Sequence, residues 1–173
     1  MSKIAGKFVT RSLAAALGFA VAQFLAASAQ AADYDVGKIH IAEPWARATP
    51  KGAEVGAGYL TIRNNGATPE RLTGGTADFA AVEIHEVSKE DGVTKMRELK
   101  EGLAIPAHGM VALAPGGFHL MFTGLKKPLA KGEVAKATLT FEHAGAVPVE
   151  FAIRGVGASG DGDNKGDMNG AKM

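Results

Sequence analysis

Alternation of apolar and polar residues in the C-terminal half of this chain strongly limits what it can fold into. In 134–142 and 147–154, every second residue is apolar: Ala135, Ala137, Leu139, Phe141, Val147, Val149, Phe151 and Ile153. Successive side chains of a strand point to opposite faces, so a period of two predicts strands buried on one face only. Antiparallel sheets tolerate one solvated face, and both segments fit that description.

Similar short segments recur along the chain between turn signals, without a convincing helical stretch after residue 31. The expected strands are 38–42, 58–63, 81–87, 93–99, 110–113, 118–123, 134–142 and 147–154. The expected connections are Asn64-Asn65-Gly66, Gly74-Gly75, Asp91-Gly92, Pro115-Gly116-Gly117 and His143-Ala144-Gly145. We predict an all-β domain and favour an antiparallel β-sandwich of two sheets over a small barrel.

The N-terminus has the pattern of an export signal. Three basic residues precede an apolar run over 13–27, and Ala29-Gln30-Ala31 supplies small residues for cleavage after Ala31. The alternative is an uncleaved anchor, but the run is shorter than the roughly 20 residues that span a bilayer. We therefore expect a signal peptide over 1–31, a folded domain over 32–155 and a soluble periplasmic protein.

Residues 156–173 are rich in Gly and Asp and poor in apolar residues, which predicts a disordered tail. Asp161, Asp163 and Asp167 imitate part of a calcium loop. However, Lys165 occupies a ligand position, and Lys172 stands where the closing Glu should be. A solvated tail is therefore the favoured interpretation.

Charge and cysteine content exclude several functions. Removing 1–31 takes away three Lys or Arg and no Asp or Glu, which changes the formal charge from +1 to −2. Such a mixed-sign surface indicates neither nucleic acid nor an anionic membrane as partner. The chain has no Cys, so disulfides, thiolate nucleophiles and a blue-copper centre are excluded. The motifs of common hydrolases, nucleotide-binding enzymes and zinc proteases are also absent, so we do not expect an enzyme.

The segment 118–123 combines a core face with an unusual second face. If it is a strand, Phe118, Leu120 and Phe122 share one side, while His119 and Met121 share the other. Burial alone does not explain a methionine aligned with a histidine on the less apolar side.

A second His–Met pair is predicted in the hairpin formed by 81–87 and 93–99. A two-residue Asp91-Gly92 loop places His85 opposite Glu98 and Val87 opposite Met96. His85 and Met96 are then diagonal neighbours, roughly 7 to 8 Å apart, on one face. A three-residue loop would instead turn Met96 to the other face.

The residues His85, Met96, His119 and Met121 together would suit Cu(I). Thioethers are soft neutral ligands, and imidazole raises the affinity. Core methionines and surface histidines are the ordinary alternative, and from residue spacing alone both interpretations stay open. His108 and Met110 form a further pair, but a histidine in a turn is usually only solvated.

The sequence resembles the periplasmic copper chaperones called PCuAC, a cupredoxin-like group. The resemblance rests on His85, ten residues, Met96, then His119-Leu120-Met121, in the contexts VEIHEV, DGVTKM and PGGFHLMFTGLKKPL. PWARAT (44–49) and GYLTIRNNG (58–66) are also similar. Two differences are Glu86, where many members carry methionine, and a gap of 22 residues between Met96 and His119, about one longer than usual in the family.

The resemblance implies a cupredoxin-like β-sandwich that binds one Cu(I) through His85, Met96, His119 and Met121. It also implies delivery to the CuA site in cytochrome c oxidase subunit II, with a Sco-type chaperone as a further partner. Some members bind extra copper in a Met- and His-rich C-terminal extension, whereas the tail here offers only Met168 and Met173. Trp45 and Arg47 also match family positions, and we interpret them as a core anchor and a rim residue.

We therefore predict a Cu(I) metallochaperone without catalytic activity. The alternatives are a periplasmic copper buffer or resistance protein without a dedicated client, and a structural β-sandwich that binds no metal.

Overall fold

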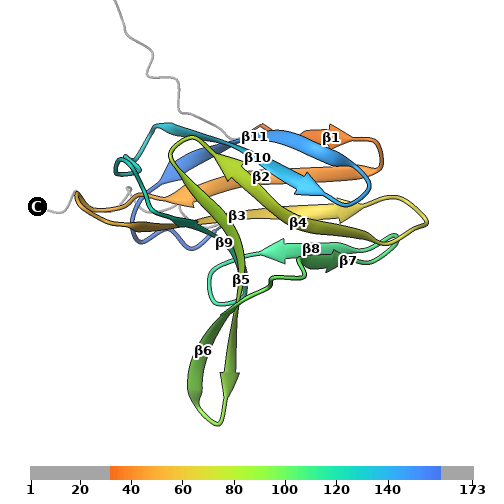
Figure 1. The fold of residues 1–173 in the computed structure, drawn as a ribbon, viewed down its shortest axis with the longest axis horizontal. Helices are drawn as coiled ribbons and strands as arrows, with labels where there is room; N and C mark the ends of the chain where they lie inside the picture. Colours follow the sequence, from red (N-terminus) through yellow and green to blue (C-terminus); the bar gives the residue numbers. More distant parts are fainter. Residues whose placement is uncertain (1–31, 161–173) are drawn as a thin grey trace, which may run out of the picture.

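The structure is a computed structural model that describes residues 32–160 (Figure 1). The predicted signal peptide and most of the predicted tail lie outside this range. The described residues form strands joined by turns, and they contain no helix that could cross a membrane. The strands are β1 (Tyr34–Val36), β2 (Ile39–Arg47), β3 (Val55–Asn64), β4 (Glu70–Ala77), β5 (Ala80–Glu90), β6 (Val93–Glu98), β7 (Leu103–Ile105), β8 (Met110–Leu113), β9 (Phe118–Thr123), β10 (Val134–Phe141) and β11 (Gly145–Arg154).

The strands form one continuous ladder. Its order is β1-β2-β11-β10-β4-β5-β9-β3-β8, with β6 paired to β5 and β7 paired to β4 off this path, and an additional β2–β3 pairing closes it into a ring. The β11–β2 pairing is parallel, and the other pairings are antiparallel. The all-β prediction is confirmed. The strands form a β-sandwich whose sheet closes on itself, as in a barrel.

The core fixes the orientation of β9. Leu120 and Phe122 have no exposed surface, and the Phe122 ring meets the Phe151 ring edge to face, with centroids 5.6 Å apart. Phe122 also lies against Gly58, where a Cβ would come within 2.8 Å of its ring. Because β9 buries this face, His119 and Met121 lie on the opposite one.

Predicted and observed strands differ most at β4. The ends of β8 and β9 agree with the prediction, whereas β1, β4 and β7 were not expected. Gly74-Gly75 was predicted to be a turn, and this is wrong, because both residues lie inside β4. A Cβ at Gly75 would lie 2.7 Å from the carbonyl oxygen of Thr138 on β10, so close strand packing explains this glycine.

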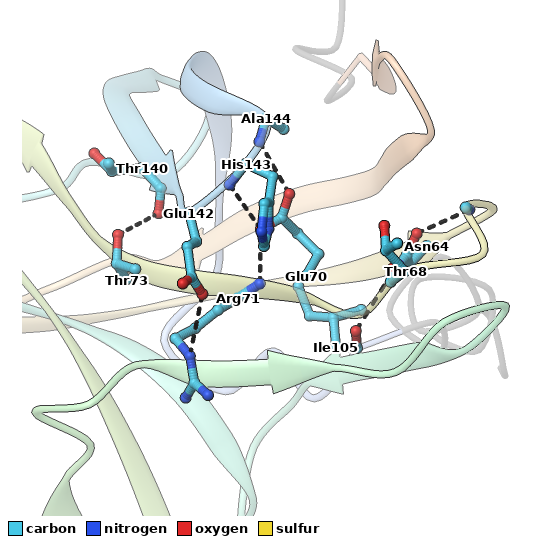
Figure 2. Close-up of polar contacts among 11 residues, drawn as sticks. Asn64, Thr68, Glu70, Arg71, Thr73, Ile105, Thr140, Glu142, His143 and Ala144 are labelled. Carbon is cyan, nitrogen blue, oxygen red and sulfur yellow. Dashed lines mark hydrogen bonds and ion pairs between the residues drawn. The ribbon is translucent and has the colours of Figure 1, made fainter.

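A buried carboxylate ties the start of β4 to the turn between β10 and β11 (Figure 2). Glu70 is 6% exposed and accepts hydrogen bonds from the backbone N–H groups of Arg71, His143 and Ala144, at 2.8, 3.0 and 2.9 Å. Its Oε1 also lies 3.1 Å from His143 Nδ1. Burial alone would raise the pKa of Glu70, but these hydrogen bonds outweigh it and hold the pKa below its usual range.

The last described residues pack against the face opposite the main core. Ala158 is 3% exposed and contacts Trp45 and Tyr59, and its carbonyl accepts a 2.8 Å hydrogen bond from Arg47 Nε. Ala158, which follows the predicted boundary at 155, is therefore packed against the domain. The calcium-like segment 161–169 lies outside the described residues.

Candidate metal centre

Two histidines meet on the face that β9 turns away from the core. β9 lies between β3 and β5, and its ladder with β5 pairs His119 directly with His85. The two ring centroids are 5.8 Å apart, and the rings are tilted by 40°. Met121 follows two residues later on the same face, opposite Glu83 on one side and Ala57 on the other.

The hairpin of β5 and β6 has the register that the sequence predicted. His85 pairs with Glu98 and Val87 with Met96, around a loop in which Asp91 and Gly92 both have positive φ angles. Such a two-residue turn fixes the register of both strands. Met96 therefore lies on the same face as His85, one diagonal step away.

The two methionines have different surroundings. Met121 is half-buried in the body of the sandwich, whereas Met96 is 53% exposed. All six residues of β6 are exposed, and the outer part of the hairpin projects from the body as an arm (Figure 1). The structure thus brings His85, His119 and Met121 together on neighbouring strands and leaves Met96 on this arm.

A carboxylate also contacts the histidine pair. Glu83 Oε2 lies 2.9 Å from His85 Nε2, and the Thr123 hydroxyl donates a 3.0 Å hydrogen bond to Glu83 Oε1. The hydrogen bond with His85 lowers the pKa of Glu83; burial opposes this shift, and Thr123 lowers the pKa further. The sequence analysis did not single out Glu83, although its i, i+2 spacing to His85 already placed both residues on one face.

The imidazoles are shielded from water. His119 is 7% exposed, and its Nδ1 lies 3.2 Å from the carbonyl oxygen of Gly117. Burial lowers the pKa of His119; the hydrogen bond to Gly117 partly opposes this, and the neighbouring His85 lowers it further. The His85 side chain is 14% exposed, and its Nδ1 is buried and has no hydrogen-bond partner among residues 32–160. Imidazole nitrogen is a ligand for copper and other transition metals, so a pair of facing histidines suits such an ion.

The further pair, His108 and Met110, is less suited to a metal. His108 is exposed in a turn with a φ of 52°, and Met110 is 53% exposed. The guanidinium of Arg63 lies 3.5 Å from the Met110 sulfur, and its positive charge would repel a bound cation. Within residues 32–160, no three His, Asp or Glu side chains are arranged to hold a metal ion.

Trp45 and Arg47 lie in a small cluster with Tyr59 and Ala158. Trp45 is 5% exposed, and its ring stacks at a tilt on Tyr59, with centroids 4.4 Å apart. The guanidinium of Arg154 lies 5.0 Å from the centre of the Trp45 ring, and that of Arg47 lies 5.6 Å from the centre of the Tyr59 ring. Trp45 therefore anchors a second, minor core.

Comparison with known proteins assigns this chain to a family. The family model described as "Putative lipoprotein LpqE-like" matches residues 39–153. A relative from Leifsonia xyli subsp. xyli, named "Putative lipoprotein Lxx21020", is 32% identical over 75% of this chain and 78% of its own length.

Two similar solved structures carry copper in their names. The copper-bound PCuAC domain from PmoF2 is 32% identical, with a TM-score of 0.60 over 72% of this chain and 98% of that one. The solution structure of CuI-DR1885 from Deinococcus radiodurans is 28% identical, with a TM-score of 0.53 over 75% of this chain and 83% of that one. The chain described here belongs to the LpqE-like family and is of the PCuAC type.

Proposed function

We propose that this protein is a copper chaperone that binds one Cu(I) through His85, Met96, His119 and Met121. The observation that carries the proposal is the direct pairing of His85 with His119, with a methionine beside each histidine on the same face. Similarity to a copper-bound PCuAC domain and to CuI-DR1885 supports the choice of ion.

The proposed ligands suit Cu(I) for chemical reasons. Thioether sulfur is soft and neutral, so it holds Cu(I) better than it holds harder ions, and two imidazoles add affinity. Four neutral ligands leave the charge of the ion uncompensated, which is unfavourable in a dry interior. The Glu83 carboxylate, which lies 2.9 Å from His85 Nε2, reduces this cost without being a ligand.

The proposed site is divided between the body and the arm, and this division favours release. His85, His119 and Met121 lie on strands paired on both sides, whereas Met96 lies on β6, which pairs with β5. An incoming ligand from a client would therefore displace Met96 first. The ion then passes from one protein to the other by ligand exchange.

The remaining parts of the proposal concern location and client. We propose export to the periplasm after cleavage of residues 1–31, a folded domain over 32–155 with Ala158 packed against it, and a solvated tail over the residues that follow. The proposed client is the CuA site of cytochrome c oxidase subunit II, with a Sco-type protein as a further partner. The protein would perform no catalysis.

An anaerobic Cu(I) titration of residues 32–173 against a chromogenic chelator, with X-ray absorption of the loaded protein, tests the site. We expect one equivalent of Cu(I) with mixed nitrogen and sulfur ligands. Absence of binding above the chelator background would overturn the proposal.

A transfer experiment separates a chaperone from a copper buffer. A chaperone passes Cu(I) to an apo subunit II domain faster than free exchange does, because a transient complex lets ligands exchange directly. A buffer retains the ion or releases it at the same rate with or without the acceptor.

A further inference from the structure

The contact between His85 and Glu83 determines which nitrogen of His85 is free. The Glu83 oxygen that lies 2.9 Å from His85 Nε2 belongs to a carboxylate, and an ionised carboxylate only accepts hydrogen bonds. His85 Nε2 must therefore carry the proton and donate it. In a neutral imidazole the other nitrogen, Nδ1, then holds the lone pair.

Glu83 is itself held in place. Its second oxygen accepts a 3.0 Å hydrogen bond from Thr123 on β9, so the carboxylate is fixed between two neighbouring strands. A carboxylate held at both oxygens cannot rotate away from His85 without losing one bond. The tautomer of His85 is thus set by the fold.

The nitrogen left free is the one that lacks a partner. His85 Nδ1 is buried and makes no hydrogen bond within the described residues. Buried polar atoms without partners are rare in proteins, and each one calls for an explanation such as a ligand or ion. The lone pair on that atom is therefore not used by any group in the described residues.

His119 shows the opposite arrangement. Its Nδ1 lies 3.2 Å from the carbonyl oxygen of Gly117, which can only accept, so Nδ1 carries the proton and Nε2 holds the lone pair. The paired histidines therefore carry their lone pairs on different nitrogens, although they lie directly opposite each other in the ladder.

We propose that Glu83 is a positioning residue that holds His85 as its Nε2–H tautomer, so that copper is bound by Nδ1 of His85 and Nε2 of His119. This inference rests on the proposed copper function. It assigns Glu83 a role in orienting a ligand, comparable to the carboxylates that hydrogen-bond to metal-binding histidines in other proteins.

Nitrogen-15 NMR of histidine-labelled protein tests the assignment, because Cu(I) is diamagnetic. Long-range proton–nitrogen spectra are recorded on residues 32–173 before and after one equivalent of Cu(I), at a pH well above the imidazole pKa. We expect His85 Nε2 to be protonated in both states. Copper should shift the Nδ1 signal of His85 and the Nε2 signal of His119.

Substitutions of Glu83 provide a second readout. Glu83→Leu removes the acceptor, so His85 should populate both tautomers and Cu(I) affinity should fall about 10- to 100-fold. Glu83→Gln keeps an acceptor and should preserve the tautomer with a smaller loss. Glu86→Gln is the matched control, because Glu86 faces away from the site and pairs with Arg97; it should leave the tautomer unchanged.

The outcomes separate this inference from the function on which it rests. If unaltered protein retains Cu(I) but shifts His85 Nε2 instead of Nδ1, copper displaces Glu83 and the positioning role is wrong. The same conclusion follows if Glu83→Leu leaves tautomer and affinity unchanged. If Glu83→Leu does not fold, Thr123→Val should still loosen Glu83 and mix the tautomers, and an unchanged tautomer there would count against the proposal. If unaltered protein retains no Cu(I), the copper function itself fails.

Discussion

His85 and His119 face each other across the β5–β9 ladder, and their ring centroids are 5.8 Å apart. The pairing joins two residues far apart in the sequence, and a methionine accompanies each histidine on the same face. Substitutions at these four positions therefore separate copper binding from folding.

Replacing Met96 and Met121 together by Ile should abolish Cu(I) retention against a competing chelator, because Ile has no sulfur. Met96 is 53% exposed, so its share of the change in unfolding free energy should stay within about 0.5 kcal/mol. Replacement of the half-buried Met121 should lower the unfolding free energy by less than about 1.5 kcal/mol. Chelator competition and thermal unfolding measure the two effects.

Met110 offers a matched control for Met96, because both are 53% exposed. Met110→Ile should retain Cu(I) fully. Loss of copper in Met110→Ile, or retention in the double variant, would refute the ligand assignment.

Acid should release Cu(I), because a protonated imidazole cannot be a ligand. Burial lowers the pKa of His119 below its usual value of about 6.5, so this residue stays neutral at mildly acidic pH. Metal analysis after rapid desalting measures the release, and we expect its midpoint to lie below pH about 6.5. Release centred above it would show that another group controls binding.

Glu70 should make folding sensitive to acid. Its pKa is lowered in the folded state, so its contribution to stability is complete above the unfolded pKa of about 4.3 and is lost as the pH falls through the folded pKa. Within that interval the unfolded chain binds more protons, and stability rises with pH. Urea unfolding at a series of pH values should show this slope, and Glu70→Gln should flatten it.

Removing the Glu70 carboxylate should be costly at neutral pH. Glu70→Ala leaves three backbone N–H groups without their acceptor, which predicts a loss of roughly 2 to 4 kcal/mol in unfolding free energy. Glu142 pairs with Arg71 at the exposed surface, so Glu142→Gln should change stability by less than about 1 kcal/mol. Equal effects of the two substitutions would contradict the role assigned to Glu70.

Gly58 should tolerate no side chain, because a Cβ there would meet the Phe122 ring at 2.8 Å. Gly58→Ala should lower the unfolding free energy by about 1 to 3 kcal/mol and, by shifting β9, weaken Cu(I) binding. Gly155→Ala, with no atom within 4 Å of the new Cβ, is the control. Unchanged stability in Gly58→Ala would show that Phe122 moves freely.

The sequence predicted the parts of the fold that follow from local pattern. The register of β5 and β6 could be predicted because a two-residue Asp91-Gly92 turn fixes which residues of the two strands face each other. Strand β9 could be predicted because the apolar residues of its core face alternate along the chain with His119 and Met121.

The features that were missed depend on partners distant in sequence. Gly75 resembles a turn residue, and only the close approach of Thr138 explains its place in a strand. The contact of Glu83 with Thr123 joins residues forty positions apart, so no local sequence motif predicts it. Strands of three residues, such as β1 and β7, are too short to show a period.

The parallel pairing of β2 with β11 has a consequence for how this chain acquires its structure. Trp45 near the start of the domain pairs with Ala152 near its end, so the ring of strands closes only when almost the entire domain is available. Contacts between segments so distant in sequence form slowly. A chain that emerges progressively from its N-terminus therefore stays open until its last strand arrives, and closure of the ring is expected to be among its slowest folding steps.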